Sequence, residues 1–283
     1  MAKVAIVTDS TSDIPESWLE KYPIHIVPLK VIFGEETYSD GVDISANEFY
    51  SRLETSTLMP STSQPNPSDF LEIYKDLLDD GFDIISIHIS LKLSATLNSA
   101  KNAAKALNTD RIFVIDSTVT CMALGLQVET LAKAALAGAT LEECKTLANS
   151  TIDHVGALFV VETLEFLKRG GRIGGAAAFL GTALNLKPIL ELQDGKIEAV
   201  ERVRTMSKAI AQMVKLLEQR LTGKNNIRLA VVHATNPKGA EKLADTLKEK
   251  FQIEQVSISD LNSVLGTHVG PGTLSVTFLS DPE

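Results

Sequence analysis

A short proline-rich stretch, MPSTSQPNPSDF at residues 59–70, concentrates small hydroxyl side chains. Ser61, Thr62, Ser63 and Ser68 lie among three prolines, which restrict the backbone of this stretch. The hydroxyls are too short to reach far and too weak to act as bases, but they can donate hydrogen bonds. Their chemistry suits the binding of one small anionic group.

Two further segments carry groups of the same kind. LSAT at 93–96 opens a predicted helix, where Ser94, Thr96 and free backbone N–H groups would form an anion site. Taken alone, a serine in this position is more often an ordinary helix N-cap. His268 lies in GTHVGPG, where glycines allow close backbone approach and a defined turn. Its imidazole would hydrogen-bond a ligand or a ligand-binding hydroxyl, or it is a loop histidine without a ligand.

Three arginines are candidates for docking an acidic or phosphate-bearing partner. Arg172 follows Gly170 and Gly171, and Arg202 and Arg204 bracket one valine on a predicted strand, so that the latter two point the same way. A surface pair of this kind is more often solvated charge, and both interpretations remain open.

Several catalytic and nucleotide-binding motifs are missing from the sequence. Gly170 and Gly175 have the spacing of a P-loop, but Ala176 stands where the phosphate-binding lysine is required. There is no dinucleotide-binding glycine fingerprint after a strand and no G-x-S-x-G elbow. A hydrolase built on Ser94 and His268 is conceivable, although no acid is indicated that would orient the histidine. The acidic residues are scattered and predict no metal site.

The composition limits the class of protein. The 283 residues are 44% hydrophobic and only 5% aromatic, which predicts an aliphatic core. A net charge of −9 argues against broad binding to nucleic acid or to anionic membranes. Cys121 and Cys144 form no C-x-x-C pair, and no apolar run reaches the roughly 20 residues of a membrane span. Without a predicted signal peptide, we expect a cytoplasmic protein without stable membrane insertion.

Strands and helices alternate along the chain, which predicts an α/β fold. Apolar runs predict strands at 3–9, 25–33, 81–90, 111–117, 157–162, 226–234, 253–259 and 272–279, and a hairpin at 188–204 that turns at Asp194-Gly195. Helical periodicity predicts helices at 68–80 (with Ser68 or Asp69 as N-cap), 93–107, 120–138, 206–221 and 236–251. We expect a mostly parallel N-terminal sheet with covering helices, and two α/β domains, 1–152 and 153–283.

Eight segments together resemble the DegV family of bacterial fatty-acid-binding proteins over essentially the whole chain. In order they are TDSTSD at the start, STSQP at 61–65, LSAT at 93–96, FLKRGGRI at 166–173, NLKPIL at 185–190, VRT at 203–205, HATNP at 233–237 and HVGPGT at 268–273. Each motif is weak alone, but eight in the right order are specific. The sequence departs from the family at Lys92 and Ala95, where glycines are usual.

The resemblance implies a fatty acid buried between two α/β domains and no other cofactor. It implies that Thr62, Ser94 and His268 hold the carboxylate as a neutral cradle without a buried cation. Ser63, Ala95 and Thr96 are then expected to support this ligand loop. Cys121, Met122 and Leu124 would line the acyl tail, although ordinary helix packing explains these three equally well.

Family members of the FakB type are non-catalytic subunits that present the fatty acid to an ATP-using kinase subunit, FakA, which makes acyl phosphate for phospholipid synthesis. The resemblance implies the same role here, with Arg172, Arg202 and Arg204 facing the kinase. Two alternatives remain: an acyl-ester hydrolase that uses Ser94 and His268, and a regulatory binder of another small carboxylate.

Overall fold

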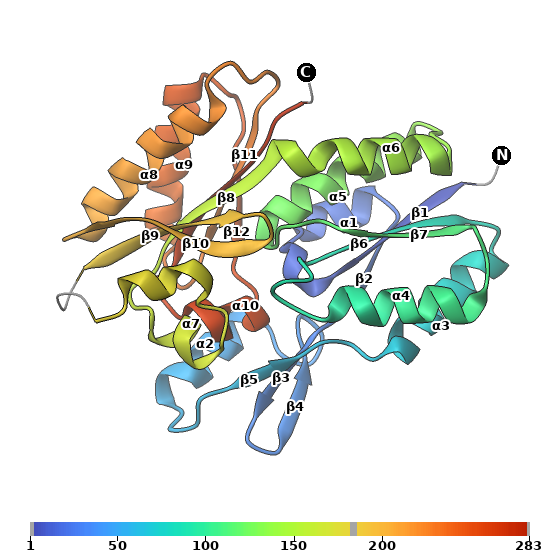
Figure 1. Ribbon diagram of the computed structural model, residues 1–283, viewed down its shortest axis with the longest axis horizontal. Coiled ribbons are helices and arrows are strands. Elements are labelled where there is room, and N and C mark those ends of the chain that lie inside the picture. The colour runs from blue at the N-terminus through green and yellow to red at the C-terminus, as the bar shows by residue number, and fades with distance from the viewer. Residues whose placement is uncertain (1–2, 182–185, 282–283) are drawn as a thin grey trace.

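A parallel sheet forms the centre of the first half of the chain. The computed structural model describes residues 3–181 and 186–281. The sheet has the order β2 (Ile24–Val27), β1 (Val4–Asp9), β6 (Asp83–His88) and β7 (Ile112–Asp116), and every neighbouring pair is parallel (Figure 1). The prediction of a parallel N-terminal sheet is therefore confirmed.

Helices cover both faces of this sheet because its strands are apolar on both sides. Ala5 and Val7 of β1 point to α3 (Pro67–Asp79) and α4 (Thr96–Leu107). Val4 and Ile6 point to the opposite face, which is covered by α5 (Cys121–Leu136), α6 (Leu141–Thr151) and the short α1 (Glu16–Lys21). Residues that alternate along a strand face opposite sides, so both layers follow from one uninterrupted apolar run.

A larger mixed sheet forms the second half. Its order is β10 (Lys196–Val203), β9 (Lys187–Gln193), β8 (Val155–Val160), β13 (Leu274–Leu279), β11 (Arg228–His233) and β12 (Ser257–Asp260), and only β11 and β12 pair in parallel among these neighbours. Helices α8 (Met206–Leu221) and α9 (Pro237–Phe251) pack on one face. The other face turns towards α5, which lies between the two sheets (Figure 1).

A third, small antiparallel sheet lies beside the junction of the two larger ones. It has the order β4 (Glu36–Ser39), β3 (Lys30–Phe33) and β5 (Ser61–Ser63), and α2 (Ala46–Thr55) follows β4. Its core of Val31, Phe33 and Phe49 continues into Leu261 and Val264 from the second half. The short elements α7 (Glu165–Arg169), α10 (Ser263–Val269), Ser10–Ser12 (η1), Ile152–His154 (η2) and Gly174–Phe179 (η3) complete the described fold.

All strands of the first and third sheets precede residue 152, and all strands of the mixed sheet follow it. We therefore retain 1–152 and 153–283 as the proposed domains. Most predicted elements lie within a few residues of their positions in the structure. The N-cap of α3 is Asn66 instead of Ser68 or Asp69, because Pro67 occupies the first helical position and Asp69 accepts a hydrogen bond from the Asn66 N–H at 2.9 Å.

The predicted strand 25–33 is wrong as a single element. It is two strands, β2 in the parallel sheet and β3 in the small antiparallel sheet. Pro28 lies between them, and a proline has no N–H to continue a hydrogen-bonded ladder. The next residue, Leu29, donates its N–H to Ser10 Oγ at 3.1 Å. The break sends the chain from one sheet to the other and so places the small sheet next to the second half.

The TDSTSD segment forms a buried hydrogen-bond network at the end of β1. One oxygen of Asp9 accepts the N–H and the hydroxyl of Thr11, at 3.1 and 2.5 Å, and the other accepts the Ile89 N–H at 2.9 Å. That second oxygen lies 3.0 Å from His88 Nδ1. A carboxylate only accepts, so Nδ1 donates to it, and Nε2 accepts from Ser86 Oγ at 2.6 Å. Asp9 thereby ties β1 to the end of β6.

Asp9→Asn should lower the free energy of unfolding by about 2–4 kcal/mol, because an amide NH2 would face one buried pair of donors. Urea unfolding followed by circular dichroism measures this loss. Asp116→Asn is the matched control: Asp116 ends β7 and accepts the Thr118 N–H at 3.0 Å, but it is only half-buried and water can replace the bond. Equal losses in the two variants would contradict the structural role of Asp9.

Candidate ligand-binding site

A cavity lies between the mixed sheet, the end of β6, the start of α5 and helix α10. It encloses about 850 Å³ of space between atoms, including its open mouth. Its wall is predominantly apolar and comes from both halves of the chain: Leu29, Ile89, Leu93, Ala157, Phe159, Leu167, Leu192, Ile197, Leu261, Val264, Leu265 and Val269. This lining is that of a site for a mainly apolar small molecule.

Thr62 and His268 meet at this cavity, although 206 residues separate them in sequence. Thr62 is the middle residue of β5 and pairs with Val31 of β3. Its Oγ1 lies 2.8 Å from Nε2 of His268. The small antiparallel sheet therefore brings the hydroxyl-rich loop of the first half to α10 of the second half.

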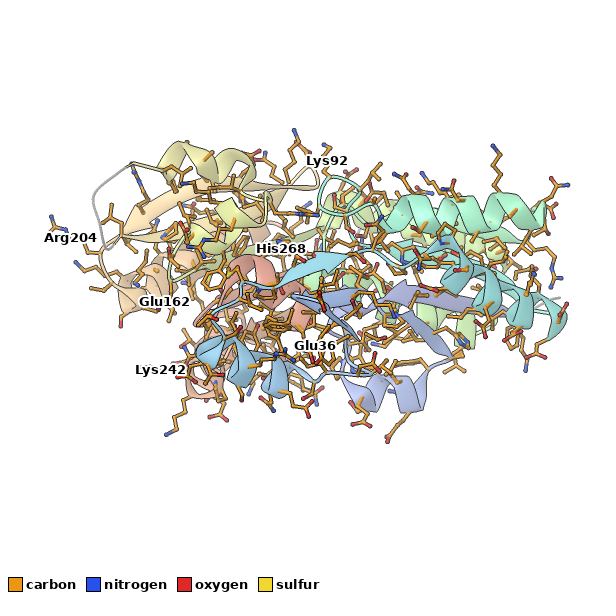
Figure 2. All side chains as sticks on the ribbon, turned by 90° about the horizontal axis from the view of Figure 1, so that it is seen from below. Glu36, Lys92, Glu162, Arg204, Lys242 and His268 are labelled. Carbon is orange, nitrogen blue, oxygen red and sulfur yellow. The ribbon has the colours of Figure 1, made fainter. Side chains whose placement is uncertain are left out.

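His268 is on a helix, which corrects the expectation of a loop histidine. It belongs to the last turn of α10, and the Gly-Pro-Gly turn follows that helix. Figure 2 shows His268 in the interior of the molecule. Its ring packs against Gly170, where an added Cβ would lie only 2.2 Å from Nδ1. Gly170 is therefore required for the ring to reach Thr62.

The imidazole of His268 is held neutral at physiological pH. Burial, together with the nearby positive charge of Arg172, lowers its pKa to about 4. Its Nδ1 is buried without a hydrogen-bond partner among the described residues. An unpaired buried N–H is costly, so the favoured tautomer carries its proton on Nε2 and donates it to Thr62 Oγ1. The Thr62 hydroxyl proton then remains available for an anion in the cavity.

Two buried carboxylates from the first half hold the start of α10. Asp13 Oδ1 accepts the backbone N–H and the side-chain amide of Asn262, at 3.0 and 2.7 Å. Asp40 Oδ1 accepts the Ser263 N–H at 3.1 Å. Burial raises the pKa of Asp13 to about 7 and that of Asp40 to about 6. The helix that carries His268 is thus positioned by side chains of the other half.

Ser94 lines the cavity and also makes the hydrogen bonds of a helix start. Its Oγ lies 2.9 Å from Thr96 Oγ1 and accepts the Thr96 N–H at 3.3 Å. The N-cap of α4 is Ala95, so the interpretation of Ser94 as the helix cap is wrong. The Ser94 hydroxyl accepts the Thr96 N–H and still has a proton to donate to a ligand. Of the expected supporting residues, Ser63 lines the cavity, whereas Thr96 is buried behind Ser94 and Ala95 is exposed as the N-cap residue of α4.

The loop that carries Ser94 is held by the turn of the β9–β10 hairpin. Ser90 Oγ donates to the carbonyl of Gly195 at 2.8 Å, and Lys92 Nζ donates to the carbonyl of Asp194 at 2.6 Å. A Cβ at Gly195 would lie 2.5 Å from Ser90 Oγ, so the close approach depends on this glycine. Lys92, one of the two departures from the family pattern, thus fixes the loop to the hairpin (Figure 2).

The three arginines expected at a partner surface lie in different surroundings. Arg172 is half-buried and lines the cavity, where its Nε donates to the Leu93 carbonyl at 3.1 Å and its Nη1 to the Gly170 carbonyl at 2.7 Å. A cation therefore stands beside the expected neutral cradle, which the sequence did not indicate. Arg202 is exposed and lies over the Phe179 ring at 4.6 Å. Arg204 follows β10 and points outwards (Figure 2).

Cys121 lines the cavity, but the other two residues expected along the tail do not. Met122 packs into the core around Phe33 and Phe49, and Leu124 packs under the parallel sheet with Ile6 and Ile87. Met122 directly follows Cys121 and points in another direction. Cys121 itself has a left-handed backbone (φ 61°), so its side chain does not share a helix face with Leu124 as the i, i+3 spacing alone would predict. The residues of TDSTSD also lie outside the cavity wall.

The geometry does not form a serine hydrolase at Ser94 and His268. The hydroxyl bonded to His268 belongs to Thr62, and among the described residues no carboxylate reaches Nδ1 to orient the ring. Residues 3–181 and 186–281 contain no cluster of three metal-ligating side chains. Within the same ranges, no helix has both the length and the apolar character required to cross a membrane.

The chain resembles known proteins over nearly its full length. The model of a family described as uncharacterised protein, DegV family, matches residues 3–281. A DegV domain-containing protein of Halalkalibacterium halodurans is 37% identical over 279 residues, which cover 98% of this chain and 99% of that protein.

Solved structures of proteins with the same family name are also similar to this chain. The crystal structure of DegV, a fatty acid binding protein from Bacillus subtilis, has a TM-score of 0.90 at 33% identity and covers 99% of this chain and 100% of that one. A DegV family protein from Thermus thermophilus, described by its fatty acid binding, has a TM-score of 0.88 at 34% identity, with 98% and 99% covered.

The buried carboxylates predict a pH dependence of stability. A raised pKa in the folded state means that the associated stability is complete below the unfolded pKa of about 4 and is lost as the pH rises through 6 and 7. Asp13→Asn should therefore be more stable than the unsubstituted protein at pH 8, by on the order of a few kcal/mol, and equally stable near pH 4. The lowered pKa of His268 makes the free energy of unfolding rise with pH. This contribution is the same in both proteins, so it cancels when their free energies of unfolding are subtracted.

Urea unfolding of both proteins between pH 4 and pH 8 tests this prediction. Asp43→Asn is the control of opposite sign, because hydrogen bonds from Ser39 lower the pKa of the exposed Asp43. Asp43→Asn should be less stable than the unsubstituted protein by a nearly constant amount between pH 5 and pH 8, since the effect of a lowered pKa is lost only below the unfolded pKa of about 4. The same pH slope in Asp13→Asn and the unsubstituted protein would contradict the raised pKa.

Proposed function

The chain belongs to the DegV family, and we propose that it binds a long-chain fatty acid in the cavity between its two halves. The observation that carries the proposal is a predominantly apolar cavity wall on which the Thr62 hydroxyl and the His268 imidazole meet and which Ser94 also lines. Solved relatives described as fatty acid binding proteins share the fold over nearly the whole chain, which supports the same ligand class here.

Thr62, Ser94 and His268 hold the carboxylate in this proposal. The neutral imidazole donates to Thr62 Oγ1, and the hydroxyls of Thr62 and Ser94 donate to the carboxylate oxygens. Each hydrogen bond to a charged acceptor contributes about 1.5–3 kcal/mol. The acyl tail supplies most of the affinity, at about 0.8 kcal/mol per buried methylene. Arg172 adds a positive charge at the cavity wall without being needed as a direct ligand.

We propose further that the bound fatty acid is presented to an ATP-dependent kinase subunit of the FakA type, which forms the acyl phosphate. This chain would then shield and deliver the substrate, and its partner would perform phosphoryl transfer. Ala176, in place of a P-loop lysine, agrees with that division. A reaction that consumes ATP and feeds phospholipid synthesis places the protein in the cytoplasm. The net charge of −9 favours no nucleic-acid partner.

The two alternative functions are less favoured. An acyl-ester hydrolase needs an acid to orient His268, and Nδ1 packs on Gly170 instead. A regulatory binder of a small carboxylate would not need apolar side chains from Phe159 to Leu192 along the cavity wall.

Native mass spectrometry of the purified protein tests the binding proposal, followed by solvent extraction and chain analysis. We expect an adduct of fatty-acid mass. The double variant Thr62→Val/Ser94→Ala should bind added palmitate or oleate at least tenfold more weakly, since it loses two charge-assisted hydrogen bonds. Ser61→Ala is the matched control, because Ser61 is exposed on the same strand. No adduct and no uptake of either acid by the unsubstituted protein would refute the proposal.

The kinase proposal predicts that Arg202→Glu/Arg204→Glu lowers acyl phosphate formation severalfold at limiting concentrations of the loaded protein, because like charges oppose docking to an acidic partner surface. The assay measures ATP consumption with a FakA-type catalytic subunit. Lys238→Glu/Lys242→Glu makes the same charge change at two exposed positions of α9, one of which is labelled in Figure 2. Reduced fatty acid uptake by Arg202→Glu/Arg204→Glu, or an equal loss in Lys238→Glu/Lys242→Glu, would contradict a docking role.

A further inference from the structure

The strands β8 and β9 are paired over only part of their length. Pairing runs from Val160 with Ile189 to Leu158 with Glu191 and stops there. Beyond that point Leu192 still pairs with Ile197 of β10, and Ala157 still pairs with Thr277 of β13. The mixed sheet is therefore split between Ala157 and Leu192, while each strand keeps its other neighbour.

A second cavity lies at this split. It is an open hollow of about 650 Å³ of space between atoms, solvent included, with a mixed wall whose apolar part contains Val155, Leu158 and Phe278. An ion pair of Arg220 with Glu191, at 2.9 Å, contributes to its polar part. Ala157 and Leu192 line both this cavity and the proposed fatty-acid cavity. The two spaces therefore come close to each other where the printed pairing of β8 with β9 ends.

The split lies further along β13 than the end of α10, which carries His268. The turn after Leu192 also holds the loop of Ser94, so depth is counted from Thr62 and His268. Thr273 lines the cavity and donates its hydroxyl to the Gly270 carbonyl, next to the end of α10. From there β13 runs past Ser275, which pairs with Phe159, to Thr277, which pairs with Ala157. Four residues of strand advance about 13 Å. An acyl tail whose carboxylate lies at Thr62 and His268 and which runs along the sheet would therefore reach Ala157 and Leu192 with its distal carbons.

We propose that Ala157 and Leu192 form a passage through the split sheet, and that the methyl end of a long saturated acyl chain passes between them into the second cavity. This inference rests on the proposed fatty-acid binding. The small side chain of Ala157 leaves the passage open, and the flexible Leu192 closes it behind shorter tails. Selection for chain length is then set at the split of β8 from β9.

The test is competition among equimolar saturated fatty acids of 12 to 22 carbons for the intact protein, measured as adduct ratios by native mass spectrometry. Ala157→Leu should shift uptake to shorter acids, with about a fourfold loss of affinity for each methylene excluded. Leu192→Ala should shift uptake to longer acids, and it provides a second route to the answer if Ala157→Leu fails to fold.

Val155→Phe tests the second cavity by itself, because Val155 lines the second cavity but not the first. It should reduce uptake of the longest acids and leave those of 14 to 16 carbons unchanged. Val42→Phe makes the same substitution at a side chain that is 73% exposed, and should leave the profile unchanged.

The outcomes distinguish this inference from the function on which it rests. If the unsubstituted protein takes up no fatty acid of any length, the proposed function itself fails. If it takes up fatty acids but Ala157→Leu and Leu192→Ala leave the length profile unchanged, the inference is overturned and the proposed function stands. If these two variants shift the profile while Val155→Phe does not, Ala157 and Leu192 are an end wall and the passage is overturned.

Discussion

The contact between Thr62 and His268 sets the conditions that the rest of the site must meet. It joins a three-residue strand of the first half to a short helix of the second, across a cavity with mostly apolar walls. A hydrogen bond at 2.8 Å tolerates little displacement, so both elements must be held by something other than the bond itself. β5 is held by its pairing with β3. Helix α10 is too short to hold itself and is positioned by its neighbours.

The positioning of α10 has an electrostatic cost. Asp13 and Asp40 each leave one oxygen buried without a partner among the described residues, and burial raises the pKa of both groups. A pair of carboxylates from one half thus fixes the helix that carries the imidazole of the other half. In turn the ring needs Gly170 behind it, because any side chain there would push it away from Thr62. Residues outside the cavity wall therefore determine whether Thr62 and His268 meet.

The sequence predicts the periodic parts of this structure well, and the reasons for its failures are physical. The parallel strands and the long helices follow from apolar runs and helical periodicity, whereas Pro28 divides a run that looks continuous by composition. Nothing local indicates that Arg172 turns inwards, since that depends on the carbonyls of Leu93 and Gly170. Met122 and Leu124 fail as cavity residues because helix rotation, not sequence proximity, decides which side chains face a cavity. The meeting of Thr62 with His268 was expected from the family resemblance, and no spacing in the chain implies it.

A cradle of hydroxyls and a neutral imidazole suits a carboxylate that must react as well as bind. A buried salt bridge would hold the carboxylate by its charge and draw electron density from the oxygen that attacks a phosphoryl group. Hydroxyl donors fix the same oxygens with weaker, directional bonds, and the apolar wall supplies the affinity that they do not. Because His268 has its pKa lowered to about 4, the cradle keeps this neutral character across the physiological range. Arg172, tied by its Nε and Nη1 to two carbonyls, adds positive potential at the cavity wall while part of its hydrogen-bonding capacity is directed elsewhere. Under the proposed function, the apolar wall that contacts the acyl tail provides the binding strength. The polar groups that contact the carboxylate preserve its reactivity.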